Sequence, residues 1–295
     1  MSEIDIVLEY LPNTLKKIIL ENISENIEEI RIRTNKPLSL KIGQETKIIE
    51  YIIKQQEVLQ AFEKVCENSV YSYRRQICDG YITIKGGNRV GIVGSAVIDN
   101  GQIININYIS SLNFRIARQK IGCSNCIIED LLDGTETIYN TLIISPPGCG
   151  KTTLLRDIIR NISNGINEIN FKGKNVGVVD ERGEIAAMYK GIAQNDIGIR
   201  TDVIDNMPKP EAMRMLVRSM SPNVIACDEI GSIEDVKAID YAMCSGVKGI
   251  FTAHGRSVEE LNRNPEISRL LVKHTFDRII LLNPFLKGDV KCIHI

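Results

Sequence analysis

An apolar run that leads into a glycine-rich turn and continues as a helical pattern sets the strictest limit on how this chain of 295 residues can fold. Residues 141–155 read Thr-Leu-Ile-Ile-Ser-Pro-Pro-Gly-Cys-Gly-Lys-Thr-Thr-Leu-Leu, a pattern typical of a buried strand, a Walker A phosphate-binding loop and a helix. Gly148 and Gly150 allow backbone N–H groups to turn inward onto a polyphosphate, and the helix N-terminus adds a positive dipole. Lys151 is predicted to reach the β- and γ-phosphates and Thr152 to bind Mg²⁺.

The loop departs from the usual motif at Ser145, which stands where the first glycine is expected. Pro146 and Pro147 stiffen the same turn, so we expect the departure to be tolerated. An unrelated glycine-rich turn is the alternative, and the alignment of strand, Gly-Lys-Thr and helix argues against it. The residues predicted to bind ATP are Ser145, Pro146, Pro147, Gly148, Cys149, Gly150, Lys151, Thr152 and Thr153.

A second acidic motif lies downstream, where the apolar run at 224–227 ends in Asp228 and Glu229. This pattern is typical of a Walker B strand, in which Asp228 would help to hold Mg²⁺ and Glu229 would orient and deprotonate water. Many ordinary strands end in Asp-Glu, so the motif gains its weight from the phosphate loop. In an open α/β sheet, ligands bind at the carboxyl ends of the strands, where both motifs are expected.

Two further predicted strands end in polar residues that fit the same site. The run at 176–180 is followed by Glu181 and Glu184, and the run at 249–253 is followed by His254. We predict catalytic roles for Glu181 and His254, the latter as a hydrogen-bonding sensor of the γ-phosphate. A solvated loop for the glutamates and a structural role for the histidine are the alternatives.

The hydrophobic pattern divides the chain into two parts. The first part carries the patterns of helices at 5–30, broken at Pro12, and at 57–65, of strands at 29–40 and 111–118, and of a hairpin formed by 81–85 and 89–93. From about residue 137, short apolar runs alternate with helical patterns, which is typical of βαβ units. We therefore predict an α/β fold with a smaller N-terminal α+β domain at 1–121, a linker at 122–136 and a larger domain at 137–295.

Composition limits the partners and the compartment. The 36 basic and 37 acidic residues leave a net charge of −1, so no overall charge draws the chain to nucleic acid or an anionic membrane. Only the segment 71–120 is clearly basic. The eight cysteines have no framework spacing, which indicates a reducing, cytoplasmic environment. The N-terminus lacks the pattern of a secretion signal, and the longest charge-free run, 100–114, is too short and polar to span a bilayer.

The motifs together resemble those of the stage III sporulation protein AA family, which is similar to the type II and type IV secretion ATPases. In the second part of the chain, the resemblance is carried by residues 143–157, 178–182, 219–222 with 228–231, and 252–255. In the first part it is carried by residues 30–33 with 36–38, 87–91 and 110–118. The likeness therefore covers nearly the whole chain.

The resemblance implies a RecA-like P-loop core that hydrolyses ATP with Mg²⁺ and assembles into a ring, expected to be a homo-hexamer. It also implies a cytoplasmic motor attached to membrane channel proteins between the mother cell and the forespore, with no membrane span of its own. The secretion ATPases have acids and a strand-end histidine at the nucleotide site, positions that correspond to Asp180, Glu181 and His254. They also receive arginines from the N-terminal domain, for which Arg89, Arg115 and Arg118 are the candidates.

Two other functions stay open at the level of sequence. A nucleotide-gated assembly protein would use ATP to order a ring and would show little turnover. A nucleic-acid-stimulated motor would use the basic segment 71–120, but that segment offers few stacking groups, chiefly Tyr71 and Tyr73, and the chain has no tryptophan. Nucleic acid is therefore not expected as a partner.

Overall fold

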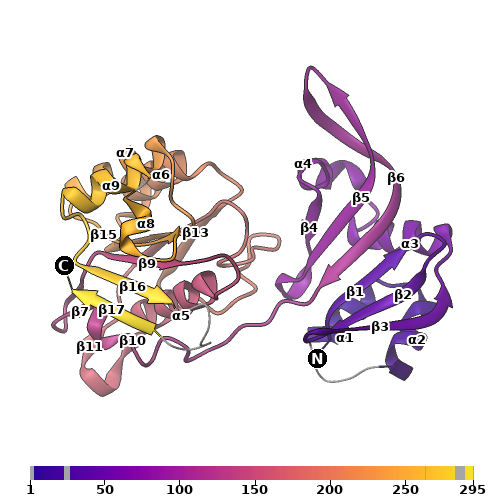
Figure 1. The fold of residues 1–295 in the computed structure, drawn as a ribbon, viewed down its shortest axis with the longest axis horizontal. Coiled ribbons are helices and arrows are strands. Elements are labelled where there is room, and N and C mark those ends of the chain that lie inside the picture. Colours follow the sequence, from indigo (N-terminus) through magenta and orange to yellow (C-terminus); the bar gives the residue numbers. More distant parts are fainter. Residues whose placement is uncertain (1–2, 23–26, 263, 283–289, 295) are drawn as a thin grey trace. The chain divides into compact units, whose positions relative to one another are not determined.

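The computed structural model describes residues 3–22, 27–262, 264–282 and 290–294. The chain forms two compact units (Figure 1). The first unit contains Met1–Arg118 together with Ala187–Gln194, and the second contains Gln119–Ala186 together with Asn195–Ile295. The short segment Ala187–Gln194, which interrupts the second unit in sequence, therefore packs with the N-terminal residues.

The first unit is built on an antiparallel sheet of six strands in the order β3-β2-β1-β6-β5-β4. Its strands are β1 (Ile27–Arg33), β2 (Pro37–Ile42), β3 (Glu45–Ile52), β4 (Tyr81–Thr83), β5 (Arg89–Asp99) and β6 (Gln102–Arg115). Its helices are α1 (Glu3–Glu9), α2 (Asn13–Asn22), α3 (Gln55–Val65) and α4 (Arg74–Cys78). The arrangement is the predicted α+β unit.

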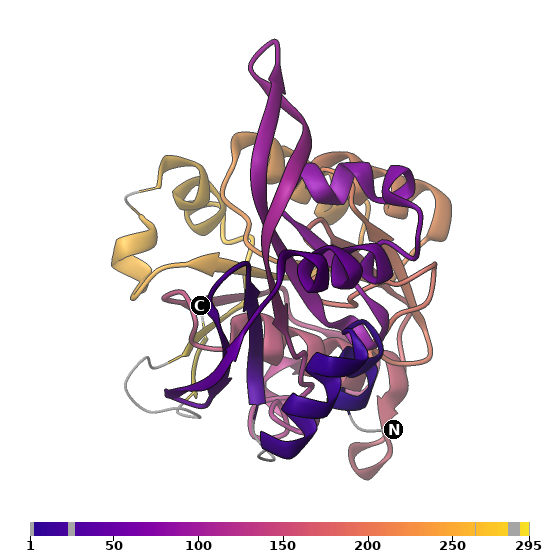
Figure 2. The same ribbon diagram turned by 90° about the vertical axis from the view of Figure 1, so that its right-hand side faces the viewer.

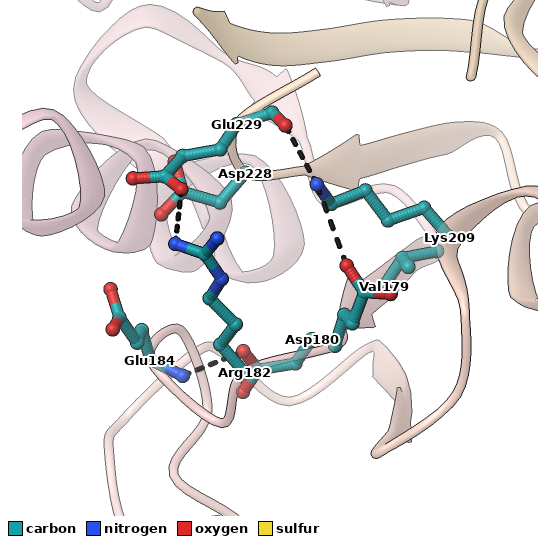
Figure 3. Close-up of a pocket in the computed structure, with 8 residues that line it drawn as sticks. Val179, Asp180, Arg182, Glu184, Lys209, Asp228 and Glu229 are labelled. Atoms are coloured by element: carbon teal, nitrogen blue, oxygen red, sulfur yellow. Dashed lines mark hydrogen bonds and ion pairs between the residues drawn. The ribbon is translucent and has the colours of Figure 1, made fainter. Parts of the chain in front are cut away.

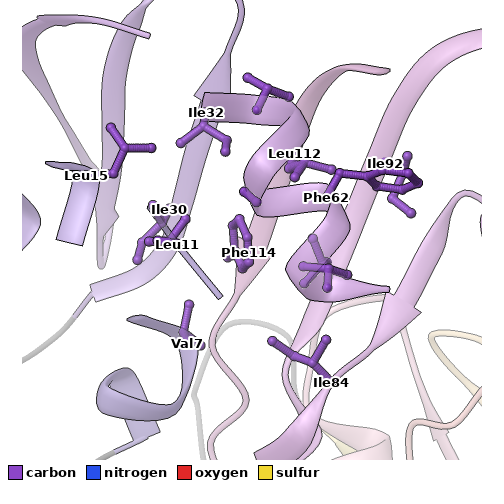
Figure 4. Close-up of a cluster of buried hydrophobic side chains, with 14 of the residues drawn as sticks. Val7, Leu11, Leu15, Ile30, Ile32, Phe62, Ile84, Ile92, Leu112 and Phe114 are labelled. Carbon is purple, nitrogen blue, oxygen red and sulfur yellow. The ribbon is translucent and has the colours of Figure 1, made fainter. Parts of the chain in front are cut away.

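Apolar side chains at helical spacing join α3 to this sheet. Val58, Ala61, Phe62 and Val65 recur along one face of α3, and all four are buried. They belong to the same core as Phe114 of β6 and the buried isoleucines of β1 (Figure 4). Burial of this face, more than helix propensity, stabilises a helix of this length.

The predicted elements of the first unit are found, but two predicted ranges run across a boundary. The strand expected over 29–40 is two antiparallel strands, β1 and β2, because a turn at 34–36, with Asn35 at φ of 57°, reverses the chain between them. The helix expected over 5–30 ends at Asn22, and β1 begins at Ile27. The alternating residues 27–33 pair with β2 and β6, so sheet formation overrides the helical pattern there. The hairpin of β4 and β5 is present, with Tyr81 opposite Gly91 and Thr83 opposite Arg89.

The charge-free run 100–114 lies almost entirely in β6, which pairs with β5 as a long ribbon (Figures 1 and 2). A bulge interrupts the ribbon between Val93 and Ser95. A side chain at Gly94 would place its Cβ 2.5 Å from the carbonyl oxygen of Asn107, so only glycine fits. Opposite it, Tyr108 has a left-handed backbone with φ of 49°.

The second unit contains a seven-stranded sheet in the order β13-β12-β14-β15-β9-β16-β17, parallel except for β17. The strands are β9 (Thr141–Ser145), β12 (Val176–Asp180), β13 (Thr201–Asp205), β14 (Val224–Cys227), β15 (Lys248–His254), β16 (Arg278–Leu282) and β17 (Val290–His294). The helices are α5 (Lys151–Asn164), α6 (Lys209–Met220), α7 (Ile233–Cys244), α8 (Val258–Leu261) and α9 (Pro265–Val272). Two short sheets pair β7 (Leu132–Asp133) with β8 (Thr137–Ile138) and β10 (Gly165–Ile166) with β11 (Phe171–Lys172).

The parallel strands explain how distant motifs meet. β12, β14, β15 and β9 are adjacent in the sheet and run in the same direction, so their carboxyl ends lie at one edge. The central strands are buried along almost their whole length, as continuous apolar runs in a covered parallel sheet should be. The predicted α/β class is confirmed.

The segment expected as a linker packs against α5. The Asp157 carboxylate accepts hydrogen bonds from the Gly122 and Ser124 backbone N–H groups, at 3.0 and 2.8 Å, and from the Ser124 hydroxyl at 2.7 Å. Arg160 donates to the same carboxylate at 2.9 Å.

None of the helices in the described residues is both long and apolar enough to cross a membrane.

Candidate nucleotide site

The phosphate-loop sequence forms the strand, turn and helix that its pattern predicts. β9 is fully buried, and α5 begins at Lys151 directly after Gly150. Gly148 and Gly150 have φ of 77° and 91°, a left-handed backbone that L side chains rarely adopt. The turn therefore needs glycine at both positions, and it exposes the N–H groups at the start of α5 to an anion.

The Lys151 side chain is held at the base of the loop. Its residue is 5% exposed, and its Nζ donates to the Ser145 carbonyl oxygen at 3.1 Å and lies 3.0 Å from His254 Nδ1. Burial lowers the pKa of Lys151, and the nearby carboxylates of Asp228 and Glu229 oppose that shift. A polyphosphate at this loop would stabilise the charged ammonium in the same way.

Thr152 and Asp228 provide a pair of oxygen atoms that fit a magnesium ion. The Thr152 hydroxyl donates to Asp228 Oδ2 at 2.5 Å, and Thr252 of β15 donates to the other carboxylate oxygen. Hydroxyl and carboxylate oxygens are the ligands that Mg²⁺ prefers, together with water and phosphate oxygens. The residues present therefore fit the metal, with Thr152 and Asp228 on adjoining elements at the carboxyl edge of the sheet.

Glu229 lies next to this pair, and a side chain contacts each of its carboxylate oxygens. Oε1 is 2.9 Å from His254 Nε2, and Oε2 forms an ion pair with Arg182. His254 thus lies between the Lys151 ammonium and the Glu229 carboxylate. Lys151 begins α5, Glu229 lies two residues past the end of β14, and His254 is the last residue of β15.

The acidic loop after β12 forms the other wall of the site (Figure 3). Asp180 accepts hydrogen bonds from the N–H groups of Glu184, Ile185 and Ala186 at 2.7 to 3.0 Å, so its carboxylate fixes the loop. Arg156 of α5 donates to the carbonyl oxygens of Glu184 and Ile185. The residues that line the pocket are Val179, Asp180, Glu181, Arg182, Glu184, Lys209, Asp228 and Glu229.

The remaining predicted site residues lie in three places: the loop, α5 and the first unit. Pro146, Pro147 and Cys149 belong to the loop itself, and the Cys149 thiol faces the Pro147 carbonyl oxygen at 3.8 Å. Thr153 is on α5 and its carbonyl oxygen accepts from the Cys123 thiol. The three candidate arginines belong to the first unit.

These arginines differ in how their own unit holds them. Arg89 stacks on the Tyr81 ring at 4.2 Å. Arg118 donates to the Ile27 carbonyl oxygen at 3.1 Å and lies 3.7 Å from a Glu3 carboxylate oxygen. Arg115, at the end of β6, is exposed.

Sequence reasoning missed four side chains that shape the site: Arg156, Arg182, Lys209 and Thr252. Arg182 belongs to the segment 178–182, whose pattern gives it no role, and Lys209 lies outside all of the motifs. Thr252 precedes His254 by two residues on the same strand, β15, and this spacing is the one available signal for it. The partners of Arg156 and Lys209 are 20 or more residues away in sequence, and no local pattern reveals them.

Known proteins resemble this chain over nearly its whole length. A family model described as "Sporulation stage III, protein AA" matches residues 2–294. The chain is 39% identical over 280 residues to stage III sporulation protein AA of Bacillus subtilis (strain 168), covering 94% of this chain and 90% of that protein.

Two solved structures share the fold. The ATPase DotB of Legionella pneumophila matches with a TM-score of 0.60 and 18% identity, over 92% of this chain and 76% of that chain. The pilus retraction motor PilT, solved with ADP, matches with a TM-score of 0.61 and 15% identity, over 90% and 76%. The antiparallel first unit and the mostly parallel second unit thus have the architecture of these ATPases.

Proposed function

The chain belongs to the sporulation stage III protein AA family, and from that membership we propose that it is a Mg²⁺-dependent ATPase that works as a motor in sporulation. The observation that carries the proposal is the meeting of three motifs at one sheet edge. There the Thr152 hydroxyl bonds to Asp228 at 2.5 Å, while His254 links Lys151 to Glu229. ATP hydrolysis needs a phosphate-binding loop, a metal site and a base that lie next to one another.

Each group has a chemical task in this proposal. The Lys151 ammonium and the N–H groups of residues 148–151 bind the phosphate oxygens, and the helix dipole of α5 adds to their field. Mg²⁺, when held by Thr152 and Asp228, supplies positive charge that offsets the charge on the transferred phosphoryl group. Glu229 accepts the proton of the attacking water, and His254 donates a hydrogen bond near the γ-phosphate.

We propose that the active form is a ring, expected to be a hexamer, in which a neighbouring subunit completes the site. Of the three candidate arginines we take exposed Arg115 as the first to test, because Arg89 stacks on the Tyr81 ring and Arg118, although also exposed, donates to the Ile27 carbonyl oxygen. An arginine supplied by a neighbour can raise turnover by about 10³- to 10⁵-fold. The membrane channel between mother cell and forespore is the proposed place of work, reached from the cytoplasm through protein partners.

The test is ATP hydrolysis per subunit, measured over a wide range of protein concentration. We expect the rate per subunit to rise with concentration and Glu229→Gln to lower it by about 10²- to 10⁴-fold, because the base is lost while the phosphate cradle remains. Glu234→Gln, an exposed glutamate in the first turn of α7, is the matched control and should keep the rate. A rate that equals that of Glu229→Gln at every concentration would favour the nucleotide-gated assembly protein instead.

A further inference from the structure

The backbone of Glu229 has an unusual conformation for the residue that would act as the base. Its φ is 53°, in the left-handed region, which a glutamate adopts only when its surroundings hold it there. The residue lies two positions past the end of β14, so this turn decides where the carboxylate points. Any group that fixes the turn therefore fixes the base.

Two side chains hold both backbone groups of Glu229. The N–H donates to the Thr252 hydroxyl oxygen at 2.9 Å, and the carbonyl oxygen accepts a hydrogen bond from Lys209 Nζ at 2.7 Å. Figure 3 shows the Lys209 side chain crossing the pocket toward the Glu229 backbone. The Lys209 side chain is 14% exposed, so its bond is well shielded from water.

Lys209 itself comes from a rigid element. It is the first residue of α6, between Pro208 at the N-cap position and Pro210, and the helix is anchored in the core by Ala212, Met213 and Leu216. Proline fixes φ on both sides of the lysine, which limits how far Nζ can drift. The same ammonium also pairs with Glu181 at 3.5 Å, so one cation joins the acidic loop to the Walker B turn.

We propose that Lys209 is a positioning residue for hydrolysis: it holds Glu229 in its left-handed conformation and keeps Glu181 beside it. This inference rests on the proposed ATPase function, and it adds a role for a side chain that lies outside the phosphate loop. Lys209 acts on the geometry of the base, so its loss should lower kcat and leave nucleotide affinity in place. A displacement of the base by about 1 Å can cost on the order of 10²-fold in rate.

The experiment compares Lys209→Met, which keeps an unbranched side chain one atom shorter and removes the ammonium, with Lys237→Met at an exposed lysine on α7. Three quantities are measured: kcat, the Kd for a fluorescent ATP analogue, and hydrogen exchange of a peptide that covers residues 228–231. For Lys209→Met we expect kcat to fall about 10²-fold, Kd to change less than about threefold, and exchange at 228–231 to accelerate. Lys237→Met should match the wild type in all three.

A double mutant separates positioning from general damage. If Lys209 acts through Glu229, then adding Lys209→Met to Glu229→Gln should lower the residual rate no further, because the base that it positions is already gone. A full additional loss in the double mutant would overturn the proposal. So would a Kd that rises in parallel with the fall in kcat, since that result indicates a collapsed site.

The exchange measurement keeps the inference separate from the ATPase proposal. If the wild-type protein shows no Glu229-dependent turnover but Lys209→Met accelerates exchange at 228–231, the proposed function fails and the role of Lys209 in holding the turn stands. Unchanged exchange at 228–231 in Lys209→Met overturns the inference, whatever the protein hydrolyses.

Discussion

Replacement of Asp157 by asparagine should reveal how strongly the segment after residue 121 is bound to the phosphate-loop helix. Asp157 is 1% exposed. Its Oδ1 accepts from the Gly122 N–H and from Arg160, and its Oδ2 accepts both the N–H and the hydroxyl of Ser124. Asparagine preserves the shape but replaces one acceptor oxygen by an NH₂ donor, which then faces donors.

The magnitude follows from the bonds that are lost. Hydrogen bonds to a charged group contribute about 1.5–3 kcal/mol each, and breaking a buried ion pair costs about 3–5 kcal/mol. The Arg160 side chain is 16% exposed and can turn partly to water, so we take a loss of about 3 kcal/mol in the free energy of unfolding. For a unit of this size, that loss lowers Tm by about 6–12 °C.

The stability lost in Asp157→Asn should also depend on pH, and the pKa of Asp157 decides whether this loss grows or shrinks as the pH falls. Burial raises that pKa, but the hydrogen bonds from Ser124, Gly122 and Arg160 outweigh burial and bring it below its usual value. A lowered carboxyl pKa stabilises the fold above the unfolded-state pKa of about 3.9, and this contribution is lost as the pH falls through the folded-state pKa. The gap between wild type and Asp157→Asn should therefore be full at pH 5–7 and shrink below about pH 4.

Thermal and urea unfolding followed by far-UV circular dichroism at pH 7, 5 and 3.5 would measure the gap. Asp133→Asn, at an exposed position on β7, is the matched control and should unfold like the wild type. A gap under about 0.5 kcal/mol at pH 7, or one that widens below pH 4, would refute the reasoning, because either result means that the buried carboxylate is not stabilised by its donors.

Two further predictions concern the segment Ala187–Gln194, which packs with the first unit, and the phosphate loop. The Glu67 carboxylate accepts hydrogen bonds from the Lys190 ammonium and the Tyr189 hydroxyl, and these bonds lower the pKa of Glu67 although burial opposes the shift. Glu67→Gln should weaken this attachment by about 1 kcal/mol and so speed tryptic cleavage after Lys190 roughly fivefold. Glu63→Gln, on the exposed face of α3, should leave the cleavage rate unchanged. Because burial lowers the pKa of Lys151 below its ordinary value of about 10.5, affinity for ATP should fall as the pH rises toward that ordinary value, since only the ammonium attracts phosphate. A Kd that stays constant up to about pH 10.5 would contradict this.

Local chemistry explains what the sequence predicted well. The phosphate loop needs a buried strand, glycines with left-handed φ and a helix that begins at Lys151, and all of these requirements lie within a stretch of fifteen residues. The hairpin of β4 and β5 is equally local. By contrast, the overextended helix prediction at 5–30 failed at Ile27, where pairing with β2 and β6 decides the outcome. A single-sequence pattern contains no information about those partners.

The site itself shows why the rest could not be predicted. Walker motifs name the residues that face the nucleotide, and these residues are recognisable because each follows its own apolar strand. The side chains that hold them come from other parts of the chain: Arg182 reaches Glu229 across 47 positions, and Lys209 reaches it across 20. Such contacts depend on which strands are neighbours in the sheet. Strand order was left open by the sequence, and once β12 is known to lie beside β14, an arginine two residues past the end of β12 can reach a glutamate two residues past the end of β14.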